Sequence, residues 1–423
     1  MNIYTNPPQQ DWAKIIARPA MDTSQMQAII SPILDNVKNN GDKALVDYAS
    51  KFDNVIIDSL SVSITEIDEA EQLLSSGLKT AIQQAYNNIY KFHSSQLQPA
   101  EKIETMPGVV CWRKSVGINK VGIYIPGGTA PLFSTVLMLA IPADIAGCEQ
   151  IILCTPPQAN GKVHPAVLYA ASISGVHTII KAGGAQAIAA LAFGTESVPK
   201  VYKIFGPGNQ YVTAAKQMVQ QFGTAIDMPA GPSEVCVLAD ESSNPTYIAA
   251  DLLSQAEHGN DSQVLLVATS QEIISNVQLQ LTEQLATLPR AAFAGNALSN
   301  SNAIVLSNLE QAIALVNEYA PEHLILATEN AEELSTKIVN AGSIFLGHYT
   351  PESVGDYASG TNHTLPTNGY ARAYSGVSVD SFVKKITVQQ LTHQGLQNIA
   401  HTVIAMAEAE GLQAHANAVK VRL

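Results

Sequence analysis

The sequence of 423 residues has few cysteines, few charged residues and no long hydrophobic run. Its four cysteines, Cys111, Cys148, Cys154 and Cys236, form no CxxC pair and lie mostly in apolar stretches. This is typical of reduced core thiols and argues against a disulfide framework. Charged residues make up only 14% of the chain and hydrophobic residues 46%, so most elements can be buried. The composition excludes an intrinsically disordered protein.

The sequence also lacks the features that attach proteins to nucleic acids or membranes. Its 36 acidic and 23 basic residues give a net charge of −13, and no run of Lys or Arg stands out. Nucleic acid and anionic membranes are therefore poor partners. The longest apolar stretch, residues 131–147, is short for a membrane span and contains Pro142 and Asp144. The first residues, MNIYTNPPQQ, carry no signal-peptide pattern, so we expect a cytoplasmic protein.

From about residue 120 onward, short apolar runs alternate with longer helical patterns. Such alternation predicts βαβ units, and hence parallel sheets covered by helices on both faces. The expected strands are residues 121–125, 150–154, 178–182, 201–205, 234–239, 263–269, 303–306, 324–326 and 343–346. Because the chain is several times the size that one core requires, we expect two or more domains.

The predicted fold is an α/β fold with two parallel-sheet, incomplete Rossmann-like domains. We expect a helical N-terminal segment at 1–22, a discontinuous first domain made of 23–120 and 235–375, and a second domain at 121–234. Residues 1–100 are mainly helical in pattern, with a 3.6-residue apolar period over 70–96. Residues 376–423 are mostly polar and helical in pattern, and they are too few to form a domain. We expect this tail to dock on another part of the assembly.

Glycine and proline cluster at the predicted strand ends, in YIPGGTAP, KAGGAQA, FGPGNQY and DMPAGPSE. In an open parallel sheet, ligands bind outside the carboxyl ends of the strands, where such turns allow a close backbone approach. Any one cluster alone is explained by a tight turn. Four at one sheet edge favour a site for a nucleotide-sized ligand, although neither GxGxxG nor GxxxxGK[ST] is present.

The stretch NPTYIAADLLSQAEHG predicts a helix that begins after an Asn244 cap, has Pro245 in its first turn and ends at Gly259. Its predicted buried face consists of Ile248, Leu252, Leu253 and Ala256. Gln255 and His258, three positions apart, would then share another face. Such a pair alone is more often a surface hydrogen bond or a capping histidine than a metal site.

Further polar candidates lie in the second half of the chain. Asp356 and His363 fall in a segment rich in Gly, Ser, Thr and Asn at 351–378, which predicts a long loop, and His415 lies near the C-terminus. Loops of that length are usually functional or disordered. A Gln, an Asp and two His side chains would suit a divalent ion such as zinc. With ten histidines along the chain, spacing alone does not select the set.

Glu322 and His323 stand together just before an apolar strand. In a turn, both side chains can face one cleft, which gives a carboxylate and an imidazole usable as acid and base near neutral pH. The pair could equally be an exposed strand entry, and the local pattern favours that interpretation.

Six longer motifs go beyond this chemistry: YIPGGTAPLFSTVLMLAIPADIAGC, KAGGAQAIAALAFGTESVPKVYKIFGPGNQYVTAAK, DMPAGPSEV, DLLSQAEHG, APEHL and VGDYASGTNHTLPTNGYARAYSGVSV. In this order they closely resemble the histidinol dehydrogenase family, from about residue 20 to the end. The resemblance implies zinc-dependent oxidation of L-histidinol to L-histidine, the last step of histidine biosynthesis. It implies two hydride transfers to NAD through an aldehyde intermediate. It also implies a homodimer in which the tail docks on the partner subunit.

The resemblance assigns roles to individual residues. It implies that the zinc ligands are Gln255, His258, Asp356 and His415. It implies that the general acid/base pair is Glu322 and His323, and that NAD contacts are made by Tyr124, Gln186 and Asn209. The implied substrate contacts are Ser233, His363 and Glu410, together with Gln255, His258, His323, Asp356 and His415.

Three alternatives remain at the level of sequence. A cysteine could trap the aldehyde as a thiohemiacetal, but neither Cys148 nor Cys154 has a His, Lys or Arg partner nearby in sequence. A non-enzymatic zinc-binding or scaffolding protein would be expected to have lost Glu322, His323 or a metal position, and all are present. A related NAD-dependent amino-alcohol dehydrogenase with another substrate stays open.

Overall fold

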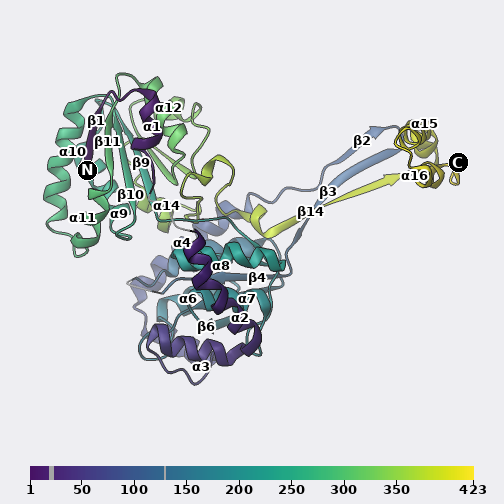
Figure 1. Cartoon of the computed structure of the whole chain (residues 1–423), viewed down its shortest axis with the longest axis horizontal. Coiled ribbons are helices and arrows are strands. Elements are labelled where there is room, and N and C mark those ends of the chain that lie inside the picture. The colour runs from purple at the N-terminus through teal and green to yellow at the C-terminus, as the bar shows by residue number, and fades with distance from the viewer. Residues whose placement is uncertain (19–22, 128–129) are drawn as a thin grey trace.

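The computed structural model of the chain describes residues 1–18, 23–127 and 130–423. Two α/β lobes lie against each other, and an elongated arm projects away from both (Figure 1). None of the described helices is long and apolar enough to cross a membrane.

The first lobe is built on a six-stranded, wholly parallel sheet with the order β1-β11-β10-β9-β12-β13. Its strands are β1 (Asn2–Thr5), β9 (Glu234–Ala239), β10 (Gln263–Ala268), β11 (Asn302–Val305), β12 (His323–Ala327) and β13 (Ser343–Leu346). One face is covered by α9 (Pro245–Ala256), α10 (Gln271–Leu285) and α11 (Ala291–Ser299). The other is covered by α1 (Gln9–Ile15), α12 (Leu309–Tyr319) and α13 (Ala331–Ser335).

The second lobe is built on a five-stranded parallel sheet with the order β6-β5-β4-β7-β8. Its strands are β4 (Lys120–Tyr124), β5 (Gln150–Thr155), β6 (Thr178–Lys181), β7 (Lys203–Phe205) and β8 (Ala225–Ile226). One face packs on α2 (Thr23–Tyr48), α7 (Gly184–Phe193) and α8 (Gln210–Val219). The other packs on α3 (Ile64–Leu73), α4 (Ser76–Ser94), α5 (Phe133–Ile145) and α6 (Pro165–Ile173).

The two sheets share one strand order. Numbered along the chain from β4, the second sheet reads 3-2-1-4-5, and the first sheet reads the same from β9, with β1 added at its edge. This is the doubly wound arrangement, in which the chain changes direction beside the first strand and leaves a crevice there. The predicted α/β class with two parallel sheets is confirmed.

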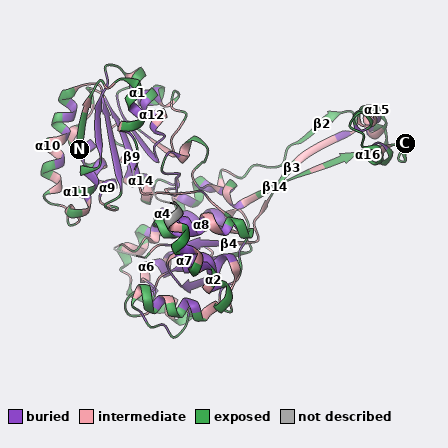
Figure 2. Ribbon diagram, viewed as in Figure 1, coloured by how far each residue is buried: buried purple, intermediate pink, exposed green. Residues whose placement is uncertain are grey.

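The arm consists of a three-stranded antiparallel sheet and two helices. Its strands are β2 (Lys102–Met106), β3 (Val109–Gly117) and β14 (Val383–Leu391), and its helices are α15 (His393–Ala409) and α16 (Gln413–Lys420). Figure 2 shows mostly exposed and half-buried residues along it, unlike the buried strands of the two lobes. Within one chain, the arm therefore has almost no core of its own.

Burial explains why the nine predicted strands are found. In β9, Val235 and Val237 pack on one helical layer while Cys236 and Leu238 pack on the other, so the strand is apolar from Val235 to its end. The chain is similarly apolar all round in α5, where ten residues in a row are buried. Continuous apolar runs of this kind are the strongest indication of buried strands and helices in the sequence.

Some expectations for the two ends of the chain are wrong. The segment at 1–22 is not wholly helical, because residues 2–5 form β1 and pair with β11 before α1 begins; residues 19–22 lie outside the described part. The tail after 376 is not wholly helical either, since β14 pairs with β3 along nine residues. Both strands are half exposed or exposed, so they lack the apolar pattern that marks a buried strand.

The predicted domain division also differs from the packing. Residues 23–120 were expected in the first domain, but α2 packs on α7 and α8, α3 on α6, and α4 on α5. The reason is that the apolar faces of these amphipathic helices find their partners in the second lobe. We therefore propose that 23–99 belong with 118–234, and that 100–117 belong to the arm with the tail.

One short helix and four irregular turns complete the described backbone. The helix α14 (Glu352–Tyr357) lies within the segment predicted as a long loop, so that expectation is wrong for these six residues. A π-helical turn, η1 (Ala49–Asp53), follows α2, and 3₁₀ turns lie at η2 (Gln220–Phe222), η3 (Tyr370–Arg372) and η4 (Val379–Phe382).

Candidate active site

Six of the residues proposed from sequence gather at the amino edge of the six-stranded sheet, where it faces the second lobe. Glu322 and His323 stand at the start of β12, and Ser233 directly precedes β9. Gln255 lies at the end of α9, His258 just beyond it, and Asp356 in α14. The structure thus brings together segments that are about 120 residues apart in the chain.

The cap and buried face predicted for α9 are confirmed, but its end is not. The Asn244 side chain accepts a hydrogen bond from the Thr246 amide at 2.9 Å. The helix ends at Ala256, and Gly259 plays no part in ending it. The His258 amide still donates to the Gln255 carbonyl at 3.3 Å, so one further turn keeps the two residues together.

The donor atoms of this cluster fit a divalent cation. The ligand atoms of His258, Glu352 and Asp356 all lie within 4.8 Å of one another. Gln255 is buried, and its Oε1 and the Oδ1 of Asp356 have no hydrogen-bond partner among the described residues. Buried polar atoms of native proteins are nearly always paired, so two oxygens left free at one place are suited to coordination.

The neighbours of Gln255 explain why its oxygen, rather than its nitrogen, is free. Its Nε2 lies 3.3 Å from the Glu234 carbonyl and 3.5 Å from a Glu322 carboxylate oxygen, both of which are acceptors. The amide group is thereby oriented, because its donor side faces two acceptors. This leaves Oε1 facing the cluster as a neutral ligand.

The charge of Asp356 also suits a metal ligand. Burial would raise its pKa, but the His323, His363 and His258 imidazoles outweigh that effect and lower the pKa to about 2. The side chain is therefore a carboxylate at neutral pH.

Glu352 is a member of the cluster that sequence reasoning missed. It is buried at the start of α14, and the Ser254 hydroxyl donates to its carboxylate at 3.3 Å. Burial raises its pKa to about 8. The signal that could have identified it is its position four residues before Asp356, which places both on one face if the segment is helical. The segment had instead been predicted as a loop.

His323 is held so that one ring nitrogen is free. Its Nδ1 lies 3.1 Å from the Glu234 carbonyl, an obligate acceptor, so Nδ1 carries the proton in the neutral ring. Nε2 is buried, has no hydrogen-bond partner among the described residues, and lies 3.4 Å from Asp356 Oδ1. Burial alone would lower the pKa of His323, but the Glu322, Asp356 and Glu352 carboxylates outweigh it and raise the pKa to about 10. A cation held by Asp356 and Glu352 would offset two of these charges and so favour the neutral ring, with Nε2 free to accept a proton.

Glu322 is a buried carboxyl beside this imidazole. Burial raises its pKa to about 8, while the His323 charge and a hydrogen bond from the Glu234 amide at 2.8 Å oppose the shift. The interpretation of Glu322 and His323 as an exposed strand entry is therefore wrong, because both side chains are buried.

A single residue, Glu234, orients the side chains of Gln255, His323 and Glu322. Its backbone amide holds Glu322, and its carbonyl faces both Gln255 and His323. Its own carboxylate makes a two-point ion pair with Arg18, at 2.6 and 2.8 Å. This contact locks the start of β9 from the far side of the site.

His363 connects the cluster to the second lobe. Its Nδ1 lies 2.8 Å from the Asp356 carbonyl, and its Nε2 lies 3.0 Å from the hydroxyl of Thr135 in α5. Since the carbonyl only accepts, Nδ1 is the donor and the Thr135 hydroxyl donates to Nε2. One helix of the second lobe thus reaches the edge of the cluster.

Glu410 and His415 are not part of this cluster. Both are exposed, Glu410 at the end of α15 and His415 in α16. Figure 1 shows these helices at the tip of the arm, well away from α9 and α14 of the same chain. A single chain therefore supplies three of the four zinc ligands that the resemblance implies.

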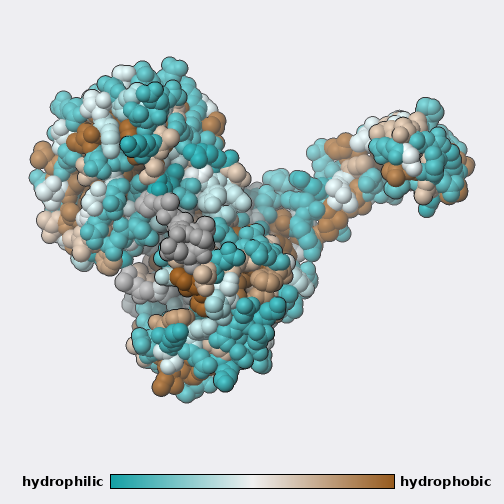
Figure 3. Space-filling model, viewed as in Figure 1, coloured by the Kyte–Doolittle hydropathy of each residue, from teal (hydrophilic) through white to brown (hydrophobic). Residues whose placement is uncertain are grey.

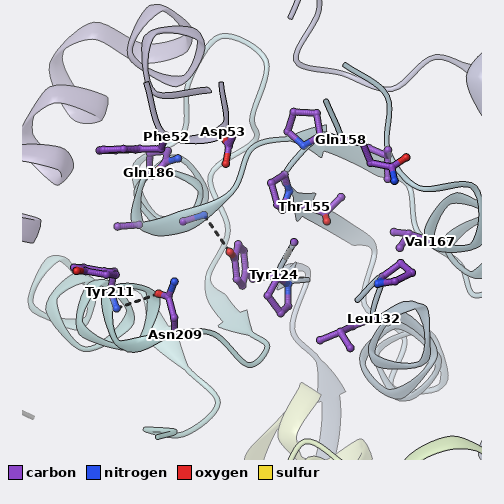
Figure 4. Close-up of a pocket in the computed structure, with 18 of the residues that line it drawn as sticks. Phe52, Asp53, Tyr124, Leu132, Thr155, Gln158, Val167, Gln186, Asn209 and Tyr211 are labelled. Atoms are coloured by element: carbon purple, nitrogen blue, oxygen red, sulfur yellow. Dashed lines mark hydrogen bonds between the residues drawn. The ribbon is translucent and has the colours of Figure 1, made fainter. Parts of the chain in front are cut away.

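The three residues assigned to NAD line a cavity of about 910 Å³ at the carboxyl edge of the five-stranded sheet (Figure 4). Tyr124 ends β4, and its buried hydroxyl accepts a hydrogen bond from the Gly184 amide at 3.0 Å. Gln186 lies in α7, and Asn209 caps α8 with its side-chain oxygen, which leaves the amide nitrogen for a ligand. Volumes of this size are usual for small-molecule sites.

Three of the four Gly/Pro clusters line this cavity, as their composition predicted. The prediction is wrong for the fourth, DMPAGPSE, because it connects β8 to β9 of the other sheet. The cavity lies beside β4 and β7, at the point where the strand order reverses. A Cβ atom at Gly206, where φ is 125°, would collide with the Tyr124 carbonyl, so the turn after β7 requires glycine. Leu132 lines the cavity and Thr135, three residues on, touches His363, so less than one helical turn separates the cavity from the cluster.

The three buried cysteines are unsuited to act as a nucleophile. Burial raises the pKa of Cys148 to about 12 and raises those of Cys154 and Cys236 further. A thiol kept protonated in this way is a poor trap for an aldehyde.

Comparisons with known proteins agree with this architecture. The sequence matches the histidinol dehydrogenase family over residues 16–423. It is 58% identical to histidinol dehydrogenase from Bacteroides thetaiotaomicron, over 100% of this chain and 99% of that protein. It is 54% identical to the chloroplastic histidinol dehydrogenase of Arabidopsis thaliana, over 96% of this chain and 88% of that protein. The crystal structure of histidinol dehydrogenase from Elizabethkingia anophelis superimposes with a TM-score of 0.98, at 56% identity, and covers 100% of this chain and 98% of that one.

Proposed function

The chain belongs to the histidinol dehydrogenase family, a family of oxidoreductases, and we propose that it oxidises L-histidinol to L-histidine through L-histidinaldehyde with reduction of two NAD. This would be the last step of histidine biosynthesis. The observation that carries the proposal is His323 Nε2, a buried and unpartnered base beside a cation-type donor set and next to a dinucleotide-sized cavity.

The donor set suits zinc and this substrate. Gln255, His258 and Asp356 would hold the ion, with Glu352 beside them and His415 supplied by the partner subunit. When bound, zinc would act as a Lewis acid that fixes the imidazole and amine nitrogens of histidinol. His258 is exposed, so the cluster is open on the side from which a substrate enters.

The acid/base pair fits two successive oxidations. With its Nδ1 proton directed at the Glu234 carbonyl, His323 would accept the substrate hydroxyl proton on Nε2 as a hydride leaves the adjacent carbon. In the second oxidation, water adds to the aldehyde. Glu322 would take the proton of that water, and His323 would again deprotonate the resulting hydrate.

The hydride acceptor would be NAD bound in the dinucleotide cavity. NAD, when bound, would accept one hydride in each oxidation. Tyr124, Gln186 and Asn209 would hold it, and the connection through α5 to His363 places the cavity beside the cluster.

We further propose a homodimer with shared active sites. Ile103, Met406 and Leu412 are between 43% and 61% exposed on the arm, and Figure 3 shows hydrophobic side chains along it. An arm that exposes apolar residues and has almost no core needs a partner surface. In a two-fold dimer, each arm would bring its Glu410 and His415 to the cluster of the other chain. Ser233 and His363 of that other chain would complete the substrate contacts.

The test is a panel of amino alcohols, with NADH formation measured per molecule of substrate consumed. We expect L-histidinol to be the preferred substrate and to yield two NADH per molecule, because both oxidations occur at one site. A yield of one, with accumulation of aldehyde, would contradict the two-step reaction. Preference for an amino alcohol without imidazole would favour the alternative, a related dehydrogenase with another substrate.

A further inference from the structure

The dinucleotide cavity contains a carboxylate to which nothing above assigns a role. Asp53 lines the cavity, and its Oδ2 is buried without a hydrogen-bond partner among the described residues. Figure 4 shows this side chain pointing toward the middle of the cavity, between Gln186 and Thr155. A carboxylate oxygen held out of water without a donor is costly, so it is a strong acceptor for a hydroxyl group of a ligand.

The local backbone presents Asp53 together with an aromatic ring. Both Phe52 and Asp53 line the cavity at the end of the π-helical turn η1. The Phe52 ring stacks on Tyr48, with centroids 5.2 Å apart and planes 3° from parallel, yet Phe52 remains 48% exposed. Asn54, in a left-handed conformation with φ 55°, then turns the chain away. Single π turns and left-handed residues of this kind occur often at binding sites.

A structural role for the Asp53 carboxylate is not supported by its contacts. Aspartate at the end of a helix commonly accepts a hydrogen bond from a nearby backbone amide. Here the Val55 amide donates to the Ala49 carbonyl instead, and the Asp53 side chain accepts no bond from the described residues. The carboxylate therefore serves the cavity rather than the turn.

The described lining residues of the cavity include no Lys or Arg to neutralise a 2′-phosphate. Lys51 has its ammonium 5.2 Å from the centroid of the Phe52 ring, but it does not line the cavity. Burial raises the pKa of Tyr124, which also lines the cavity, to about 12, and the Asp53 charge contributes to that shift. Sites for NADP normally supply an arginine for the 2′-phosphate, whereas sites for NAD supply a carboxylate for the ribose hydroxyls.

We propose that Asp53 accepts hydrogen bonds from the hydroxyl groups of the adenosine ribose and thereby makes this protein specific for NAD over NADP. The inference rests on the proposed function in one respect, namely that this cavity binds the dinucleotide. Two carboxylate oxygens match the two hydroxyls of a ribose diol. A 2′-phosphate would remove one donor and place negative charge against the Asp53 carboxylate, with no Lys or Arg among the described lining residues to offset it.

The unaltered protein provides the first test, by calorimetric titration with dinucleotides in the absence of histidinol. NAD⁺ should bind at least about tenfold more tightly than the analogue that lacks the 2′-hydroxyl of the adenosine ribose. The reason is that the analogue loses a hydrogen bond to a charged group. NADP⁺ should bind more weakly still. Equal affinities for the three would overturn the proposal without any variant.

Asp53→Asn provides the second test, because it keeps the shape and removes the charge. It should weaken NAD⁺ binding about tenfold and weaken binding of the 2′-deoxy analogue less, since that ligand has only the 3′-hydroxyl left to donate to the carboxylate. The difference in affinity between NAD⁺ and NADP⁺ should become smaller. Asp58→Asn is the matched control, since Asp58 is exposed five residues along and does not line the cavity. It should bind all three ligands as the unaltered protein does.

Two outcomes with the variant would contradict the assigned role. In one, Asp53→Asn weakens NAD⁺ and the 2′-deoxy analogue equally, which indicates a general change in the cavity. In the other, the preference for NAD⁺ over NADP⁺ is unchanged. Either can occur while the protein still produces two NADH per histidinol, so failure here is distinguishable from failure of the proposed function. If histidinol is not oxidised but the binding preferences are as stated, the proposed function alone fails.

Discussion

Gln255 and His258 illustrate how much of the site a sequence can predict at the scale of single residues. The helix cap at Asn244 and the apolar face of α9 follow from local rules, and these place the two side chains close together. Local rules say nothing about Asp356, which lies about 100 residues away. Its selection from the sequence depended on the family motif. Only the fold shows that its Oδ1 and Gln255 Oε1 both lack a hydrogen-bond partner among the described residues, and that both side chains adjoin His323.

Removal of a ligand should separate metal binding from folding. We expect His258→Ala to retain little zinc and to lose activity, because a metal site rarely tolerates a missing ligand. The measurements are metal content after dialysis and the circular dichroism spectrum, which should stay unchanged since His258 is exposed. His348→Ala, at another histidine outside the cluster, is the control and should retain zinc. A His258→Ala protein that retains full zinc would contradict the ligand assignment.

Glu322→Gln should separate the two half-reactions. The amide keeps the shape of the side chain but cannot take a proton from water, so aldehyde oxidation should slow by about 10²–10⁴-fold. Alcohol oxidation should slow less, and zinc should remain bound. Each half-reaction can be measured separately by supplying either L-histidinol or L-histidinaldehyde. Equal slowing of both would argue against Glu322 as the base for water.

At the scale of elements, the burial of a strand decides whether the sequence predicts it. All nine strands predicted from apolar runs are present, because each is covered on both faces by helices. The five strands that the patterns missed, β1, β2, β3, β8 and β14, lie at a sheet edge or in the arm, where few side chains are buried. Their pairing depends on long-range contacts, such as the nine-residue register between β3 and β14, which a local pattern does not record.

The arm offers a prediction about an element. Deletion of residues 393–423 removes α15 and α16 but keeps β14 paired with β3 and leaves both lobes complete. We expect the shortened protein to bind NAD⁺ as before, because no residue of the cavity is lost. It should have no measurable histidinol oxidation, since Glu410 and His415 are removed. Calorimetry and NADH absorbance provide the two measurements, and undiminished turnover would contradict a role for the arm.

At the scale of the whole molecule, we propose that one chain is incomplete as a catalyst. Its lobes bring together Gln255, His258 and Asp356, while His415 lies at the tip of an arm that points away from them. From sequence, the tail could be recognised as too short to fold alone. The direction in which it projects is a property of the folded chain, because the length and rigidity of the β3–β14 ladder decide it.

The central claim is that each active site combines the lobes of one chain with the arm of another, and mixing two inactive variants tests it most directly. Asp356→Ala and His415→Ala proteins, each inactive alone, are combined under conditions in which subunits exchange. In a mixed dimer with crossed arms, one site carries both lesions and the other carries neither. With random exchange of equal amounts, half of the dimers are mixed, so about a quarter of the unaltered activity should appear. If His415 serves its own chain, every site keeps one lesion, and a mixture that stays inactive after confirmed exchange would contradict the shared site.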